Sequence, residues 1–124
     1  MAKILLVEDD AIQRMTYRRF LELEGHKVID VDDGIAALKV FSANPGFDVV
    51  VTDVLMPGLD GSGLIHGMLK IRPDLPVIAI SAGRRVLTPE FALESANFAG
   101  STFELTKPFS RSDLKIAVDK AIKR

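Results

Sequence analysis

One stretch decides how the rest of the chain is organised: Phe47-Asp48-Val49-Val50-Val51-Thr52-Asp53-Val54-Leu55-Met56-Pro57. The three consecutive valines are typical of a strand that is buried on both faces, because the run is β-branched and too short for a buried helix. The strand leads into Asp53 and then into a turn closed by Pro57 and Gly58. In an open parallel α/β sheet, ligands bind outside the carboxyl ends of the strands. We therefore predict that the Asp53 carboxylate faces a crevice.

The composition is typical of one globular domain. The chain has 124 residues, of which 48% are hydrophobic and 27% are charged, and its net charge is −1. This length allows a full core, and the charge gives no general attraction to nucleic acid or anionic lipid. The absence of cysteine excludes disulfides, thiolate metal sites and a cysteine nucleophile. The first apolar run is too short for a signal peptide or a membrane span. We therefore expect a cytoplasmic protein with no direct nucleic-acid partner and no membrane partner.

Five apolar strands alternate with five helical patterns along the chain. Strands are expected over 3–7, 27–32, the central run from Phe47, 77–80 and 103–106, and helices over 11–24, 35–43, 62–72, 88–98 and from Ser110 onward. Such alternation predicts a parallel sheet with helices on both faces. Ser110 followed by Asp113 has the pattern of a capping box at the start of the last helix.

The first predicted helix has an apolar side and a charged side. Its apolar side is expected to carry Ile12, Met15, Thr16, Phe20 and Leu23. Its charged residues suit the solvated side, and these are Arg14, Arg18, Arg19 and Glu22.

Polar residues follow four of the predicted strands, and a parallel sheet brings these strand ends to one edge. They are Glu8-Asp9-Asp10, Asp53, Ser81 and Lys107. Converging carboxylates without a cysteine or histidine cluster are typical of a site for a hard divalent cation, and we predict Mg²⁺. A hydroxyl and a lysine suit an anion with several oxygens, such as a phosphoryl group. A carboxylate can also be a nucleophile that carries phosphate as an aspartyl phosphate.

With these residues in view, the chain resembles the receiver domain of two-component response regulators over essentially its whole length, residues 1–124. Five stretches carry the resemblance in order: Ile4–Asp10, Asp33-Gly34 with Ala37-Leu38, Asp53 with Met56-Pro57-Gly58, Val77–Ala82, and Lys107-Pro108-Phe109. Each stretch alone is weak, but five in order are specific. The resemblance implies a flavodoxin-like, doubly wound sheet of five parallel strands in the order 2-1-3-4-5, with five helices.

The resemblance also implies a phosphorylation-dependent signalling switch. Asp53 would accept a phosphoryl group from a sensor histidine kinase or phosphotransfer protein. Mg²⁺ would be held by Asp9, by Glu8, by Asp53 itself and by the backbone carbonyl of Leu55. Asp10 is left outside the ligands, because neighbouring residues on a strand point to opposite faces.

Two more positions complete the implied site, and one position departs from the family pattern. Ser81 would be the switch hydroxyl that binds a phosphoryl oxygen, and Lys107 would contact the phosphoryl group, with a cis bond to Pro108. Three residues before this lysine, receivers commonly carry an aromatic residue, but here the position holds Glu104. The aromatic residue Phe103 is one position earlier and so is expected on the opposite face of the strand. We therefore expect phosphorylation to be coupled to output differently from the usual pattern.

The output implied by the resemblance is a contact with an unknown downstream protein, altered by phosphorylation in a monomer or a phosphorylation-dependent dimer. If the chain is complete it is a stand-alone receiver, and it could equally be excised from a larger protein. One alternative is a receiver-like interaction module that works without phosphorylation.

Two further alternatives belong to other classes of protein: one is an enzyme and the other is a redox protein. An aspartate-nucleophile phosphohydrolase typically has a second aspartate two residues after the nucleophile, where this chain has Leu55. A flavodoxin-like electron carrier is disfavoured because Glu8-Asp9-Asp10 would repel a phosphate at the first strand end. We therefore expect slow self-dephosphorylation and no multiple-turnover enzyme.

Overall fold

The computed structural model describes residues 1–54, 61–81 and 102–123. Its strands form one parallel sheet: β1 (Lys3–Val7), β2 (Lys27–Val31), β3 (Val49–Asp53), β4 (Val77–Ser81) and β5 (Phe103–Thr106). Their order is β2-β1-β3-β4-β5, which confirms the predicted order. The helices are α1 (Ala11–Leu23), α2 (Gly34–Ala43), α3 (Gly61–Ile71) and α5 (Arg111–Ile122). The helix predicted over 88–98 lies outside the described residues.

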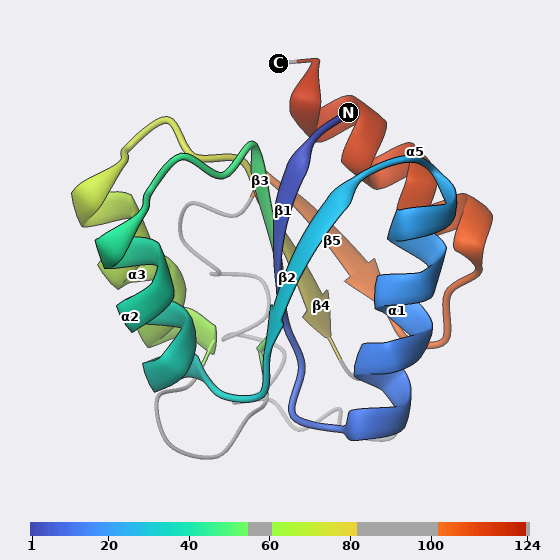
Figure 1. Ribbon diagram of the computed structural model, residues 1–124, viewed down its shortest axis with the longest axis horizontal. Helices are drawn as coiled ribbons and strands as arrows, with labels where there is room; N and C mark the ends of the chain where they lie inside the picture. The colour runs from blue at the N-terminus through green and yellow to red at the C-terminus, as the bar shows by residue number, and fades with distance from the viewer. Residues whose placement is uncertain (55–60, 82–101, 124) are drawn as a thin grey trace, which may run out of the picture.

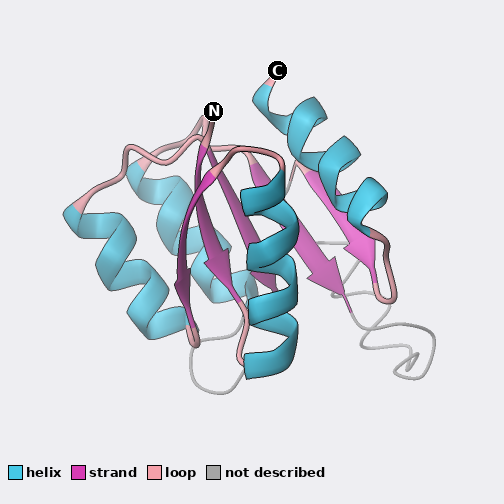
Figure 2. Ribbon diagram, turned by 45° about the vertical axis from the view of Figure 1, so that its right-hand side comes forward, coloured by secondary structure: helices cyan, strands magenta, loops and turns pink. Residues whose placement is uncertain are grey.

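Helices cover both faces of the sheet. Helices α2 and α3 lie on one face and α1 and α5 on the other (Figure 1). Strand β1 alternates between the two layers, with Leu5 and Val7 packed toward α2 and α3, and Ile4 and Leu6 toward α1 and α5. The valines 49–51 of β3 are fully buried, which confirms that this strand is covered on both faces. All five strands point the same way, so their carboxyl ends form a single edge, away from the two chain termini (Figure 2).

The buried face of α1 differs from the predicted one. Its buried residues are Tyr17 and Leu21, whereas Ile12 and Met15 are 78% and 71% exposed. The Tyr17 ring stacks on Phe109, with ring centroids 4.9 Å apart, and this contact ties α1 to the chain that follows β5. Of the predicted apolar side, Phe20 is partly buried and packs against the core. The prediction is wrong for Ile12 and Met15, because the helix packs through Leu21 and through Tyr17, an aromatic residue with a polar tip.

The prediction that all the arginines of α1 are solvated is also wrong. Arg14 and Arg18 both bind Asp30, a residue of the neighbouring strand β2. The Arg14 side chain is only 20% exposed. A long cationic side chain can lie on the inward side of a helix when a carboxylate on the next element neutralises it.

The last helix begins at the predicted capping box. The Ser110 hydroxyl accepts a hydrogen bond from the Asp113 N–H at 3.0 Å, and the Asp113 carboxylate accepts one from the Ser110 N–H at 3.0 Å. We expect Ser110→Ala to lower the free energy of unfolding by about 1 kcal/mol, because the first turn loses a cap. Urea denaturation measures the effect. Ser112→Ala, an exposed change inside the same helix, is the control and should leave stability unchanged or slightly raise it.

Candidate functional site

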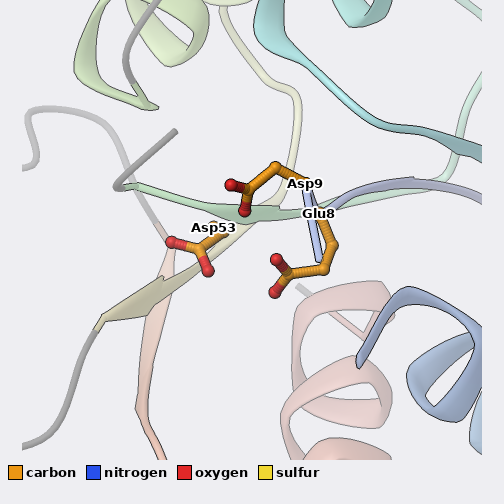
Figure 3. Close-up of side chains that lie close together, drawn as sticks. All are labelled: Glu8, Asp9 and Asp53. Atoms are coloured by element: carbon orange, nitrogen blue, oxygen red, sulfur yellow. The ribbon is translucent and has the colours of Figure 1, made fainter. Parts of the chain in front are cut away.

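Three carboxylates converge at the carboxyl ends of β1 and β3. Glu8 and Asp9 directly follow β1, and Asp53 is the last residue of β3. One oxygen of each carboxylate lies within 4.8 Å of the other two (Figure 3). Glu8 and Asp53 are buried, and Asp9 is exposed. The convergence predicted from the parallel sheet is therefore confirmed.

Asp10 has a different task in the same turn. Its carboxylate accepts a hydrogen bond from the Gln13 N–H at 3.0 Å and caps the amino terminus of α1. Its own N–H donates to the Glu8 carboxylate at 3.0 Å. The three acids of this turn therefore have different structural roles: Asp10 caps helix α1, and Glu8 and Asp9 belong to the carboxylate cluster.

Lys107, which directly follows the edge strand β5, brings a positive charge to the cluster. Its Nζ donates to Asp53 Oδ2 at 2.6 Å and to Glu8 Oε1 at 3.2 Å. Its backbone N–H donates to the Ser81 carbonyl at 2.9 Å, which continues the pairing of β4 with β5 and fixes where the lysine leaves the sheet. The peptide bond to Pro108 is cis, as predicted. Lys107 therefore bridges two of the three acids.

Burial and crowded charges alter the acid–base properties of this cluster. Burial, together with the nearby Asp53 charge, raises the pKa of Glu8 from its usual 4.5 to about 7, against the opposing effect of the hydrogen bond from the Asp10 N–H. Burial lowers the pKa of Lys107, but its hydrogen bond to Asp53 and the charges of Asp53 and Glu8 outweigh this and raise it above the usual value. The lysine is therefore firmly protonated, and the acids are crowded.

The donor set fits a hard divalent cation. The cluster offers three carboxylates, and one ammonium group contacts two of them. Carboxylate oxygens are the ligands that Mg²⁺ takes from proteins, and water supplies the rest of its octahedron. One acid is exposed, so a hydrated ion can enter from that side. The predicted ligand Leu55 lies outside the described residues, so the structure does not place its carbonyl.

Ser81 reaches the same edge of the sheet from β4. In the pairing of β3 with β4, Asp53 lies opposite Ile80, so Ser81 is one residue further along. Its Oγ lies 3.5 Å from both the Leu105 carbonyl and the Thr106 hydroxyl. These contacts are long for hydrogen bonds, so they hold the hydroxyl loosely.

Phe103 and Glu104 lie on opposite faces of β5, as the sequence predicts. Phe103 is half-buried and packs against the core layer of α1 and α5, and Glu104 is exposed. The aromatic side chain is thus part of the core on one face of the sheet, and the opposite face at this position carries a carboxylate.

One contact of the site was missed by the sequence analysis. Arg14 Nη1 donates to the Glu8 carbonyl at 2.9 Å, and Arg14 Nε donates to Asp30 Oδ2 at 3.2 Å. The available signal was Asp30 itself, an acid between the apolar residues Ile29 and Val31 of a strand. Such a carboxylate needs a cationic partner.

Comparisons with known proteins agree with this geometry. The family model of the response regulator receiver domain matches residues 4–119. The response regulator protein FleR of Pseudomonas aeruginosa is 41% identical over 109 residues, which are 87% of this chain and 22% of FleR. A response regulator receiver domain protein from Clostridium thermocellum superposes with a TM-score of 0.86 at 30% identity, covering 100% of this chain and 96% of that one.

A further solved structure contains the cation itself. The receiver domain of a sensor histidine kinase from Pseudomonas aeruginosa PAO1 has a magnesium ion coordinated in its active-site cleft. It superposes with a TM-score of 0.86 at 28% identity and covers 99% of this chain and 98% of that one. The chain spans 22% of FleR and 46% of a response regulator MprA from Mycobacterium sp., so it corresponds to only part of these curated relatives.

Proposed function

Because the chain belongs to the response regulator receiver domain family, we propose that Asp53 is the residue that accepts the phosphoryl group. The observation that carries this is its position: a buried carboxylate at the end of the central strand, bound by Lys107 at 2.6 Å and grouped with two other acids. A carboxylate oxygen of Asp53 would attack phosphorus and form the new O–P bond, while the donor's leaving group departs with the electron pair of the bond that breaks. Receiver domains are phospho-acceptors, so the expected end product is a phosphoprotein.

Glu8, Asp9 and Asp53 would hold the Mg²⁺, and the Leu55 carbonyl is the further ligand that the sequence predicts. When bound, the ion supplies positive charge that neutralises the phosphoryl oxygens during transfer. Asp9 is the exposed acid, so it can receive a hydrated ion. Glu8 lies deeper and is held by the Asp10 N–H, which fixes its carboxylate.

Lys107 would contact the phosphoryl group, and Ser81 would act as the switch hydroxyl. In the unphosphorylated chain the Lys107 ammonium binds Asp53, so it stands within reach of a group attached to that carboxylate. The Ser81 hydroxyl has only long contacts, so little is lost when it turns toward a phosphoryl oxygen. Its reorientation would shift the population of conformers at this edge of the sheet.

Membership of the family implies a histidine kinase as the phosphoryl donor. We infer that a phosphotransfer protein is a second possible donor and that output passes to a downstream protein, with the chain as a monomer or a phosphorylation-dependent dimer. Within the described residues, no helix is long and apolar enough to span a membrane. A role in the cytoplasm, without contact to membrane or nucleic acid, agrees with the near-neutral charge.

Intact-mass measurement after incubation with acetyl phosphate tests the proposal. We expect one phosphoryl adduct per chain, formed with Mg²⁺ and absent with a chelator, because the crowded acids need the ion before an anionic donor can approach. The absence of any adduct, under conditions that label a known receiver domain, would contradict the proposed phospho-acceptor. Release of many phosphates per chain would instead indicate a phosphohydrolase.

A further inference from the structure

The peptide that joins two of the acids is held from both sides. The Glu8 N–H donates to the Val31 carbonyl at 3.2 Å, and the Glu8 carbonyl accepts from Arg14 Nη1 at 2.9 Å. That carbonyl belongs to the planar peptide between Glu8 and Asp9, so its direction sets how the two residues leave the strand. The Arg14 contact therefore acts on both acids through the backbone.

The turn needs such a restraint. Three carboxylates with oxygens within 4.8 Å repel one another, and one of them, Asp9, is exposed and lies on the turn after β1. Metal sites work when their ligands are held close to the productive geometry by groups outside the ligand set. Arg14 is well placed for this task because it lies one turn into α1, whose first residues are fixed by the Asp10 cap.

Asp30 explains how a positively charged arginine can lie beside a site for a metal cation. A bare guanidinium near the acids would oppose the binding of Mg²⁺. Arg14 Nε is bound to Asp30 Oδ2 at 3.2 Å, and the other oxygen of this carboxylate is bound by Arg18. The side chains of Arg14 and Asp30 are 20% and 23% exposed, so the pair is partly shielded from solvent. The positive charge of Arg14 is thus balanced by Asp30, a carboxylate that is not a member of the acid cluster.

We propose that Arg14 is a positioning residue of the Mg²⁺ site, which fixes the Glu8–Asp9 peptide through its bond to the Glu8 carbonyl. The inference rests on the proposed function, because it assumes that Glu8, Asp9 and Asp53 bind the ion. Arg14 touches neither the ion nor the phosphoryl group in this role. It differs in this respect from Lys107, which contacts the carboxylates themselves.

Arg18 provides a matched control on the same helix. It shares Asp30 with Arg14, and its other bond goes to Glu22 at 3.3 Å, on the exposed side of α1. Removing either arginine takes one cation from Asp30. Only the removal of Arg14 also takes a hydrogen bond from the Glu8 carbonyl.

Isothermal titration calorimetry of the whole chain with Mg²⁺ tests the proposal. We expect Arg14→Ala to raise the Kd for Mg²⁺ about tenfold, the scale on which loss of a group that orients metal ligands acts. Arg18→Ala should stay within about twofold of the wild type. In acetyl phosphate labelling, Arg14→Ala should need more Mg²⁺ for half-maximal rate yet approach the wild-type rate at saturation. A variant that was merely less stable would keep its Kd while folded.

The outcomes separate the two proposals. If the wild type binds no Mg²⁺, the proposed metal site is wrong, and the role proposed for Arg14 is then wrong as well. If the wild type binds Mg²⁺ and Arg14→Ala binds equally well, only the role of Arg14 is wrong. If circular dichroism shows that Arg14→Ala is unfolded, Arg14→Lys is compared with Arg18→Lys. A lysine keeps the charge but cannot hold Glu8 and Asp30 together in the same fork, so weaker Mg²⁺ binding by Arg14→Lys alone supports the role, and equal binding overturns it.

Discussion

An Asp53→Asn variant is expected to lose phosphoryl labelling by acetyl phosphate by more than about a hundredfold, because an amide replaces the nucleophilic carboxylate. The change preserves the shape of the side chain at the end of β3. In the wild type the Lys107 ammonium donates to Asp53 at 2.6 Å, and the amide oxygen of the variant can still accept this hydrogen bond. The variant should therefore fold, and the initial rate of labelling with radioactive acetyl phosphate measures the loss.

Asp10→Asn is the matched control for this experiment. It removes a carboxylate two residues from Glu8, and asparagine caps a helix as well as aspartate does. The Asp10 side chain accepts from the Gln13 N–H and is not a member of the acid cluster. Labelling close to the wild-type rate is expected for this variant. Residual labelling of Asp53→Asn at that same rate would show that another residue is the acceptor.

The fold and the place of the site were predictable because both depend on local patterns. Valines 49–51 identify the central strand, and strand–helix alternation makes the sheet parallel. Once the sheet is parallel, the residues after its strands must meet at one edge, whatever the details of packing. Glu8, Asp9 and Asp53 are brought together in this way.

The contacts of α1 were not predictable from the same patterns. Partners on other elements determine which residues of this helix are buried or partly buried, and these are Tyr17, Leu21 and Arg14. Asp30 on β2 and Phe109 after β5 are far away in sequence, so no periodicity within the helix reveals them. Exposed Ile12 and Met15 show that an apolar residue on a helix is not necessarily inside.

The electrostatic balance of the acid cluster was hidden for the same reason. The sequence predicts that Lys107 lies near Asp53. It does not predict the second contact of this lysine, the 3.2 Å hydrogen bond to Glu8. Nor does it reveal that Glu8 is fully buried while Asp9 beside it is exposed. Adjacent acids thus have different environments, which only the packing of the turn determines.

The burial of Glu8 leads to a second large effect, on stability rather than on chemistry. In the Mg²⁺-free protein we expect the free energy of unfolding to fall as the pH rises from about 4.5 to about 7. The folded chain keeps the Glu8 proton up to a pKa of about 7, while the unfolded chain gives it up near 4.5, so the folded state binds more protons in this window. The difference corresponds to a loss on the order of 3 kcal/mol by the alkaline end.

Urea denaturation with a chelator, between about pH 5 and about pH 8, measures this dependence. Glu8→Gln removes the titrating group, so its stability should fall less steeply with pH, and Glu22→Gln on the exposed side of α1 should keep the wild-type slope. Mg²⁺ binds the deprotonated acids, so the stabilisation it gives the wild type should grow with pH. Equal slopes for the wild type and Glu8→Gln would show that Glu8 does not hold a proton in the folded chain. The expected result means that deprotonation of Glu8 lowers the stability of the Mg²⁺-free chain, and that bound Mg²⁺ offsets this loss at neutral pH.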